Sequence, residues 1–218
     1  MKQSVPDLPY GDHFFTRDGS FYSTWLRLFL LLAFQNIITY SVNVADNVML
    51  GVYDQTALSG AAAVNQLQYI LQQVIGGGLG DGLVVLGAQL WGRRDTDGLQ
   101  NLAGYALKCG WIIGLLLTAV AFVTPDGLVS LFTNDAAIIA EGAAYLRVMR
   151  WSYLIFITTS LLLSLLRSVQ IAGIAFRLSV MTLIVNVGIN RVLIFGELGF
   201  PEMGIRGAAI GTLAARIL

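Results

Sequence analysis

The sequence has little charge: only 12% of its 218 residues are charged, whereas 56% are hydrophobic. A soluble globular domain would carry roughly a quarter charged residues. The formal net charge is zero, which argues against a nucleic-acid partner. This composition excludes an ordinary soluble domain and predicts a protein that folds within membrane lipid.

Cysteine, histidine and proline are also scarce. The single cysteine, Cys109, excludes an intrachain disulfide and a cysteine-based zinc site. The single histidine, His13, lies outside every apolar segment, whereas an intramembrane enzyme would need a nucleophile–base pair or a metal cluster at membrane depth. All four prolines lie at or beyond the ends of the apolar segments, as helices in lipid require. We therefore predict no enzymatic activity and no bound cofactor.

Five segments are long and apolar enough to span a membrane, which takes about 20 residues. They are residues 25–50, 58–90, 99–123, 138–166 and 174–196. A sixth begins near Ile205 and stops at Leu218, too early to span. We therefore predict an all-α, polytopic membrane bundle of about six transmembrane helices, the sixth truncated. Residues 1–24 are expected to be a polar cytoplasmic segment, and 25–218 an incomplete amino-terminal transmembrane lobe.

The basic residues predict the orientation of the chain. Those in or beside alternate loops are Lys2, Arg17, Arg93, Arg94, Arg167 and Arg177. The intervening loops 51–57 and 124–135 contain no lysine or arginine. By the positive-inside rule, the amino terminus lies in the cytoplasm of a multi-pass protein of the plasma (inner) membrane.

A polar stripe crosses the first predicted span. At 100° per residue one arc of about 100° contains Gln35, Asn36, Thr39, Asn43 and Asp46. Such a stripe must face protein or water, and the amides alone are explained by interhelical hydrogen bonds. A carboxylate at this depth is costly and marks function, so the stripe predicts an ion or proton site at Asp46.

The fifth predicted span carries a second polar face. Asn186 and Asn190 are four residues apart on it, at a depth similar to that of Asp46. One carboxylate and two amide oxygens suit a hard cation such as Na⁺. Alternatively, Asp46 exchanges a proton, and the sequence leaves both possibilities open.

The second predicted span has amides on one face, Asn65, Gln68 and Gln72, followed by a glycine-rich run that includes Asp81. The run lacks the Lys-Ser/Thr ending and the preceding strand of a phosphate-binding loop, so we interpret its glycines as close packing of helices. Asp81 is a secondary candidate that lines a cavity or pairs with Lys108. Arg191 is expected to pair with Asp46 or, preferably, to reach the lipid headgroups.

Several motifs resemble one transporter family. The motifs, in chain order, are Ala45-Asp46-Asn47-Val48-Met49-Leu50-Gly51, Gly87-Ala88-Gln89-Leu90-Trp91-Gly92-Arg93-Arg94-Asp95, Asn186 to Gly196, Gly199-Phe200-Pro201 and Gly207 to Thr212. Over residues of roughly 35–218 their order and spacing resemble the multidrug and toxic compound extrusion (MATE) transporters.

The resemblance implies a twelve-helix antiporter of two six-helix lobes around a central cavity, which exports small organic, often cationic, compounds in exchange for Na⁺ or H⁺. It implies that the cation site of the amino-terminal lobe consists of Asp46, Asn186, Asn190, Ala208 (through its backbone) and Thr212. The cavity face would comprise Gln35, Asn36, Asn43, Asn65, Gln68, Gln72 and Asp81. The second lobe is missing from this chain and is expected in a longer product or in another chain.

The chain departs from the family pattern at three positions. Many members have an aspartate where this chain has Asn190, and a proline where it has Leu31. Asp81 stands where small or uncharged residues are usual. Two alternatives stay open: a lipid-linked or polysaccharide flippase of the same superfamily, and a fragment without function of its own. A flippase for anionic cargo should have a basic cavity, whereas the predicted cavity faces show amides and carboxylates.

Overall fold

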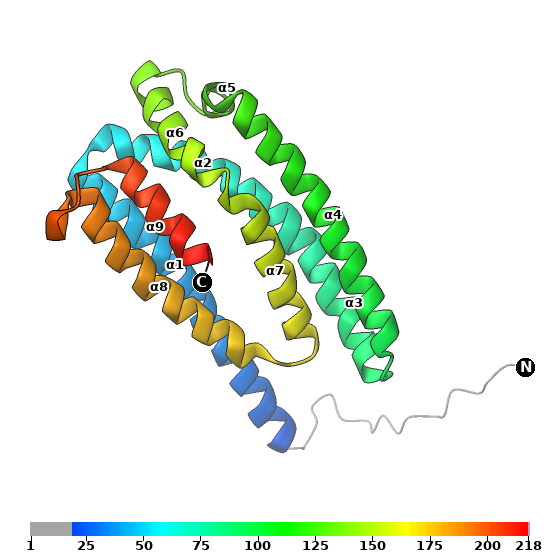
Figure 1. The fold of residues 1–218 in the computed structure, drawn as a ribbon. Coiled ribbons are helices and arrows are strands. Elements are labelled where there is room, and N and C mark those ends of the chain that lie inside the picture. Colours follow the sequence, from blue (N-terminus) through cyan, green and yellow to red (C-terminus); the bar gives the residue numbers. More distant parts are fainter. Residues whose placement is uncertain (1–18, 218) are drawn as a thin grey trace, which may run out of the picture.

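A computed structural model describes residues 19–217, with Ala172 described by its backbone only, and this part contains helices and no strand. The elements, shown in Figure 1, are α1 (Gly19–Tyr53), α2 (Gln55–Gln72), the π-helix η1 (Gln73–Gly80), α3 (Asp81–Gly92), α4 (Thr96–Val123), α5 (Pro125–Ser130), α6 (Ala136–Met149), α7 (Ser152–Ser168), α8 (Ala172–Phe195), the 3₁₀ turn η2 (Glu197–Gly199) and α9 (Ile205–Ile217). The predicted all-α class is confirmed.

Four of these helical stretches are long and apolar enough to cross a membrane, and a bent pair provides a fifth. The four are Gly19–Tyr53, Gln55–Gly92, Thr96–Val123 and Gly173–Phe195. The chain is therefore a multi-pass membrane protein. Residues 1–18 of the predicted amino-terminal segment lie outside the described residues, and residues 19–24 are helical because α1 begins at Gly19. The aromatic residues Phe21, Tyr22 and Trp25 continue the apolar character of α1 into this first part.

The predicted single span 138–166 is wrong in one respect, because the helix is broken. The axes of α6 and α7 differ by 59° at Arg150 and Trp151. Ser152 donates its hydroxyl to the carbonyl oxygen of Met149 at 2.7 Å, and such back-bonding by serine bends helices. The Arg150 guanidinium lies 3.7 Å from the centroid of the Phe122 ring in α4, which holds the turn in place.

The second predicted span is continuous, but its middle is a π-helix. A Cβ added at Gly80 would lie 2.8 Å from Oγ of Ser164 in α7, so the predicted close packing holds there. At Gly76, Gly78 and Gly82 nothing lies within 4 Å. Because a π turn holds more residues than an α turn, η1 also shifts the face on which Asp81 falls relative to Asn65.

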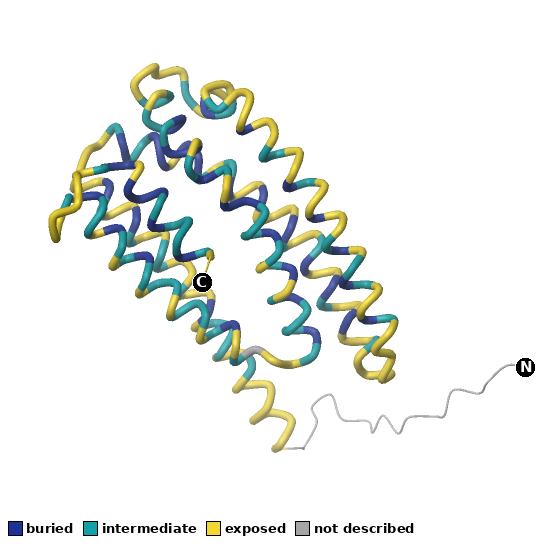
Figure 2. The backbone as a smooth tube through the Cα atoms, viewed as in Figure 1, coloured by how far each residue is buried: buried dark blue, intermediate teal, exposed yellow. Residues whose placement is uncertain are grey.

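The helices form two groups. In one group α8 packs between α1 and α9, and in the other α7 packs against α3 and α4 while α2 packs against α6. The groups meet where α6 packs on α9 and α1 on α2. Most buried residues line the faces turned inward, and the outer faces are exposed along most of their length (Figure 2).

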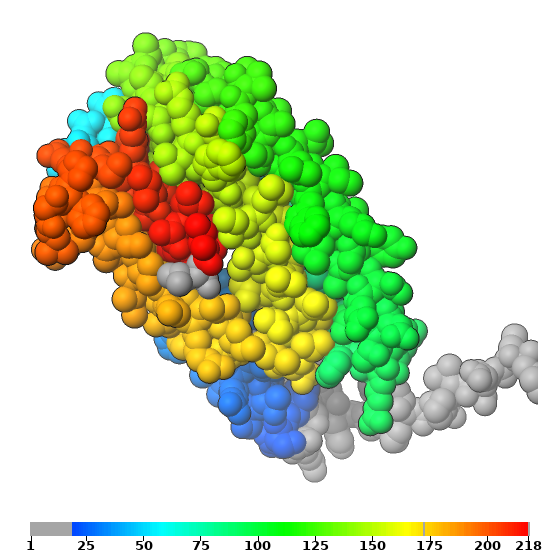
Figure 3. Space-filling model, in the orientation of Figure 1, coloured from blue at the N-terminus to red at the C-terminus, as the bar shows by residue number. Residues whose placement is uncertain are grey.

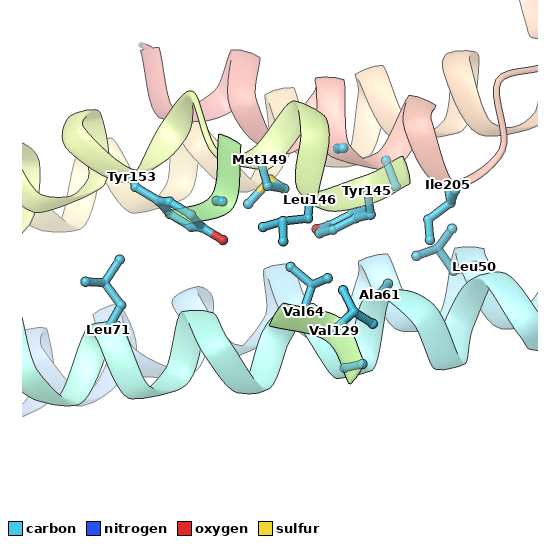
Figure 4. Close-up of a cluster of buried hydrophobic side chains, with 14 of the residues drawn as sticks. Leu50, Ala61, Val64, Leu71, Val129, Tyr145, Leu146, Met149, Tyr153 and Ile205 are labelled. Atoms are coloured by element: carbon cyan, nitrogen blue, oxygen red, sulfur yellow. The ribbon is translucent and has the colours of Figure 1, made fainter. Parts of the chain in front are cut away.

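The apolar core lies between α2 and the broken pair α6–α7. It joins Val64 and Leu71 of α2 to Leu146 and Tyr153, all of them buried (Figure 4). The hydroxyls of Tyr145 and Tyr153 point toward one another on either side of Leu146. This core therefore contains two phenol hydroxyls among its apolar side chains.

Candidate ion-coupling site

The carboxylate of Asp46 lies inside the group formed by α1, α8 and α9. Asp46 is 8% exposed, and seven further residues of α1 follow it before the helix ends at Tyr53. Its Oδ1 accepts a hydrogen bond from Asn190 Nδ2 at 2.5 Å, and its Oδ2 accepts one from Thr212 Oγ1 at 3.4 Å. Both carboxylate oxygens therefore have a partner, each from a different helix.

The asparagines close this arrangement into a ring. Asn190 Nδ2 also donates to Asn186 Oδ1 at 3.4 Å, and Asn186 Nδ2 donates to Thr212 Oγ1 at 3.3 Å. Both asparagines are fully buried in α8, and their spacing of four residues places them on one face. The ring thus links α1, α8 and α9 through four polar side chains.

Glycines of α9 make room for this ring. A Cβ added at Gly211 would overlap Asn190 Oδ1, and one added at Gly207 would lie 2.6 Å from the carbonyl oxygen of Leu193. Gly207 and Gly211 form a G-x-x-x-G pattern, which lets helix backbones approach closely in membranes. The close approach of α9 to α8 is what brings Thr212 to Asp46.

One oxygen of the ring has no hydrogen-bond partner in the described part of the chain. Asn190 Oδ1 is buried and accepts no hydrogen bond, and its amide orientation is fixed because Nδ2 faces two acceptors. An unpaired buried acceptor is costly, so the site has unused capacity to bind a cation or a donor. In the part of the chain described, no three His, Cys, Asp or Glu side chains gather into a metal cluster. A single carboxylate among neutral oxygens suits a monovalent ion.

The structure brings together four of the five residues expected at the ion-coupling site, and Ala208 lies buried one turn before Thr212 on α9. Their role in coupling stays a prediction. The stripe of α1 is divided: Gln35 is buried, whereas Asn36, Thr39 and Asn43 are exposed. An arc of 100° is wide enough for its two edges to face different surroundings.

The expected cavity residues of the second span are divided in the same way. Gln68 is buried, Asn65 is half-buried, and Gln72 and Asp81 are exposed. The predicted Asp81–Lys108 and Asp46–Arg191 pairs are both absent from the described residues. Lys108 lies over the ring of Tyr105, and Arg191 pairs with Glu197 at 3.1 Å.

The sequence interpretation missed Arg216. This residue lies one turn beyond Thr212 on α9, and its guanidinium reaches Gln68 and Ser152 in the interior of the lobe. A cation therefore lies beside Gln68, one of the amides expected on the cavity face. The spacing of four residues from Thr212 was a signal that could have found it.

Membrane-length helices thus surround a buried carboxylate that is held by neutral partners, and this arrangement marks a functional site inside a membrane protein. The MatE family profile matches residues 32–192. The chain therefore belongs to the MatE (MATE, multidrug and toxic compound extrusion) family, as its motifs predicted.

A curated relative and two solved structures illustrate the similarity. The probable multidrug resistance protein NorM of Thermotoga maritima is 28% identical over 195 residues, which cover 88% of this chain and 41% of NorM. A MATE crystal structure in a bent conformation matches with a TM-score of 0.78 at 22% identity, over 90% of this chain and 43% of that one. A MOP superfamily transporter from Pyrococcus furiosus, described as having a binding pocket of reverse polarity, matches with a TM-score of 0.77 at 22% identity, over 89% and 42%. The chain spans about two fifths of the length of these relatives, corresponding to an amino-terminal half.

Proposed function

We propose that this chain is the ion-coupling, amino-terminal lobe of a secondary-active antiporter in the plasma membrane. The whole protein exports small organic compounds, cationic ones included, in exchange for Na⁺ or H⁺. The observation that carries the proposal is the ring of Asp46, Asn190, Asn186 and Thr212, which ties α1 to α8 and α9 through one carboxylate. Membership of the MatE family supports it.

The ring gives ion binding a mechanical consequence. With Asp46 ionised, both of its oxygens accept hydrogen bonds and hold α1 to the other two helices. A proton on the carboxyl group turns one acceptor into a donor, and a bound Na⁺ competes with Asn190 and Thr212 for the same oxygens. Either ion changes how firmly α1 is held, and the difference in affinity between two arrangements is what couples ion and substrate.

The site admits either ion. Na⁺ prefers oxygen ligands, which are available here from Asp46, Thr212 and the unpaired Asn190 Oδ1. A proton needs only the carboxylate. We propose that the amino terminus lies in the cytoplasm, as the basic loops predict, so that external cations reach Asp46 from the side where α1 ends.

The test is ion-driven efflux by the full gene product in proteoliposomes, with Asp46→Asn as the variant. The substitution keeps the size of the side chain and removes its charge, and we expect a loss of at least about 100-fold in ethidium efflux driven by a Na⁺ or a pH gradient. Separate Na⁺ and pH gradients identify the ion.

The matched control is Asp97→Asn, which neutralises an exposed acid in the first turn of α4. It should transport as the unmodified protein does. Retained gradient-driven efflux in well-folded Asp46→Asn protein would refute the proposal, whichever ion is supplied.

A further inference from the structure

Arg216 is a cation placed deep inside the lobe. It lies in the last turn of α9, about 16 Å along the helix from Ile205, and its side chain is half-buried. An arginine at this depth is costly in a membrane, so its presence by default marks a functional site. Its position on the face of Thr212 turns it inward.

The guanidinium is held by three neutral groups from two other helices. Nη1 donates to Ser152 Oγ at 2.8 Å and to Gln68 Oε1 at 3.3 Å, and the guanidinium carbon lies 5.0 Å from the centroid of the Phe156 ring. Ser152 is fully buried and Gln68 is 9% exposed. These contacts fix the plane of the guanidinium between α2 and α7.

Within the part of the chain that the structure describes, Arg216 forms no ion pair. The ion pairs within residues 19–217 join Arg147 to Asp126 and Arg191 to Glu197, and both oxygens of Asp46 are bound by Asn190 and Thr212 instead. Among the described residues, Nε and Nη2 of Arg216 have no hydrogen-bond partner. One edge of the guanidinium is therefore open.

Two further polar groups near Arg216 have no hydrogen-bond partner within residues 19–217. Nε2 of Gln68 and the hydroxyl of Tyr153 are buried without a hydrogen bond, although Gln68 and Tyr153 are each at least nine-tenths buried. Tyr153 follows Ser152 in α7 and lies within electrostatic range of Arg216. Unused buried donors beside an open guanidinium edge are what an oxyanion would satisfy. In the space-filling view a furrow runs between α8 and α9 on one side and α7 on the other (Figure 3).

We propose that Arg216, Gln68 and Tyr153 form a subsite that binds the oxyanion group, a carboxylate, sulfonate or phosphate, of a small organic substrate. The open edge of an arginine presents two parallel N–H groups, which match such a group in a bidentate manner. Ser152 and Phe156 position the guanidinium for this contact. The inference rests on the proposed transport function and extends its substrates to organic anions and zwitterions.

The test is binding of fluorescein, an organic anion, to the purified full gene product, measured by fluorescence polarisation without an ion gradient. We expect Arg216→Gln to weaken fluorescein binding about 10- to 100-fold, because a charge-assisted, bidentate contact is lost. Binding of ethidium, an organic cation, is measured in parallel, and the affinity ratio of fluorescein to ethidium should fall by about the same factor. The matched control is Arg206→Gln, an exposed arginine at the start of the same helix, which should leave both affinities as they are.

The outcomes separate the alternatives. Absence of fluorescein binding to the unmodified protein, unchanged binding in Arg216→Gln, or equal loss for both probes each overturns the subsite. If Arg216→Gln does not fold, Arg216→Lys is tested instead. Lysine keeps the positive charge but lacks the planar guanidinium that makes a bidentate contact. Fluorescein binding to Arg216→Lys at full affinity would therefore overturn the proposal. Because no gradient is used, failure of this test leaves the coupling role of Asp46 standing, and failure of ion-driven efflux leaves the binding result standing.

A second arm distinguishes a lipid headgroup from a small molecule. Movement of fluorescent phosphatidylglycerol across proteoliposome membranes is followed by dithionite quenching. Movement that depends on Arg216, together with an absence of fluorescein binding, would assign the subsite to phospholipid and overturn the small-molecule assignment. Fluorescein binding that depends on Arg216, without lipid movement, supports it.

Discussion

Two polar clusters share helix α9 and are built in opposite ways. Around Asp46, Asn190 and Thr212 turn donors toward an anion, whereas around Arg216, Ser152 and Gln68 turn acceptors toward a cation. Only one turn of α9 separates Thr212 from Arg216. Neutral partners hold both side chains and the two charges form no ion pair, as our two proposals require.

Both clusters depend on the packing of α9 against α8. The largest effect is therefore expected for Gly207→Ala, which disrupts this packing. The added Cβ would lie 2.6 Å from the Leu193 carbonyl oxygen, and backbone cannot move aside as a flexible side chain can. We expect a loss of stability of about 1–3 kcal/mol and loss of both clusters together. The measurement is the midpoint of thermal unfolding in detergent, followed by size-exclusion chromatography of heated samples.

The control for that substitution is Gly188→Ala, an exposed helical glycine of α8 with nothing within 4 Å of the added Cβ. It should unfold at the same or a slightly higher temperature, because alanine favours helix by about 1 kcal/mol over glycine. Equal midpoints for the two variants would show that α8 and α9 are not closely packed.

The next largest effect is expected for Thr212→Val, which affects the Asp46 cluster alone. Valine keeps the shape of threonine and removes the hydroxyl that bridges Asp46 and Asn186. We expect ion-driven ethidium efflux to fall about 10-fold, since a buried carboxylate loses one donor and a buried amide loses its acceptor. Initial rates in proteoliposomes measure this, and a rate equal to that of the unmodified protein would remove Thr212 from the site.

The smallest effect is expected for Ser152→Ala, which affects the Arg216 cluster. The guanidinium loses its 2.8 Å acceptor but keeps Gln68 and Phe156, so fluorescein affinity should fall by about 3-fold. Combining Ser152→Ala with Thr212→Val sharpens the comparison. If the two substitutions change the free energy of fluorescein binding additively, the clusters act separately. A departure from additivity would show that α9 couples the two clusters energetically.

Helix geometry predicted three members of the Asp46 cluster, the carboxylate and the two asparagines, whereas Thr212 was expected only from the resemblance to the MATE family. Two asparagines four residues apart must share a face, and similar depth in neighbouring spans brings them near the carboxylate. The sequence interpretation could not predict how α1 is rotated, and so it grouped exposed Asn36 and Asn43 with buried Gln35. That rotation follows from packing against α8, which no local pattern encodes.

Features that depend on distant contacts were missed or misread. The break between α6 and α7 contains neither proline nor glycine, and it follows from a serine hydroxyl and from the stacking of Arg150 on Phe122. Arg216 was missed because its partners, Gln68 and Ser152, lie far from it in the sequence. Only their meeting in space makes the basic cluster visible.

The π-helix η1 gives the second span a built-in register shift. Each π turn holds one residue more than the i→i+4 pattern requires, so deleting one glycine between Gly76 and Gly78 would restore α-helical spacing. Because the π-helix already absorbs this extra residue, the deletion would leave the faces of both α2 and α3 unchanged. The exposed Asp81 would keep its direction, so this is a place where the span could lose one codon without a change in its lining.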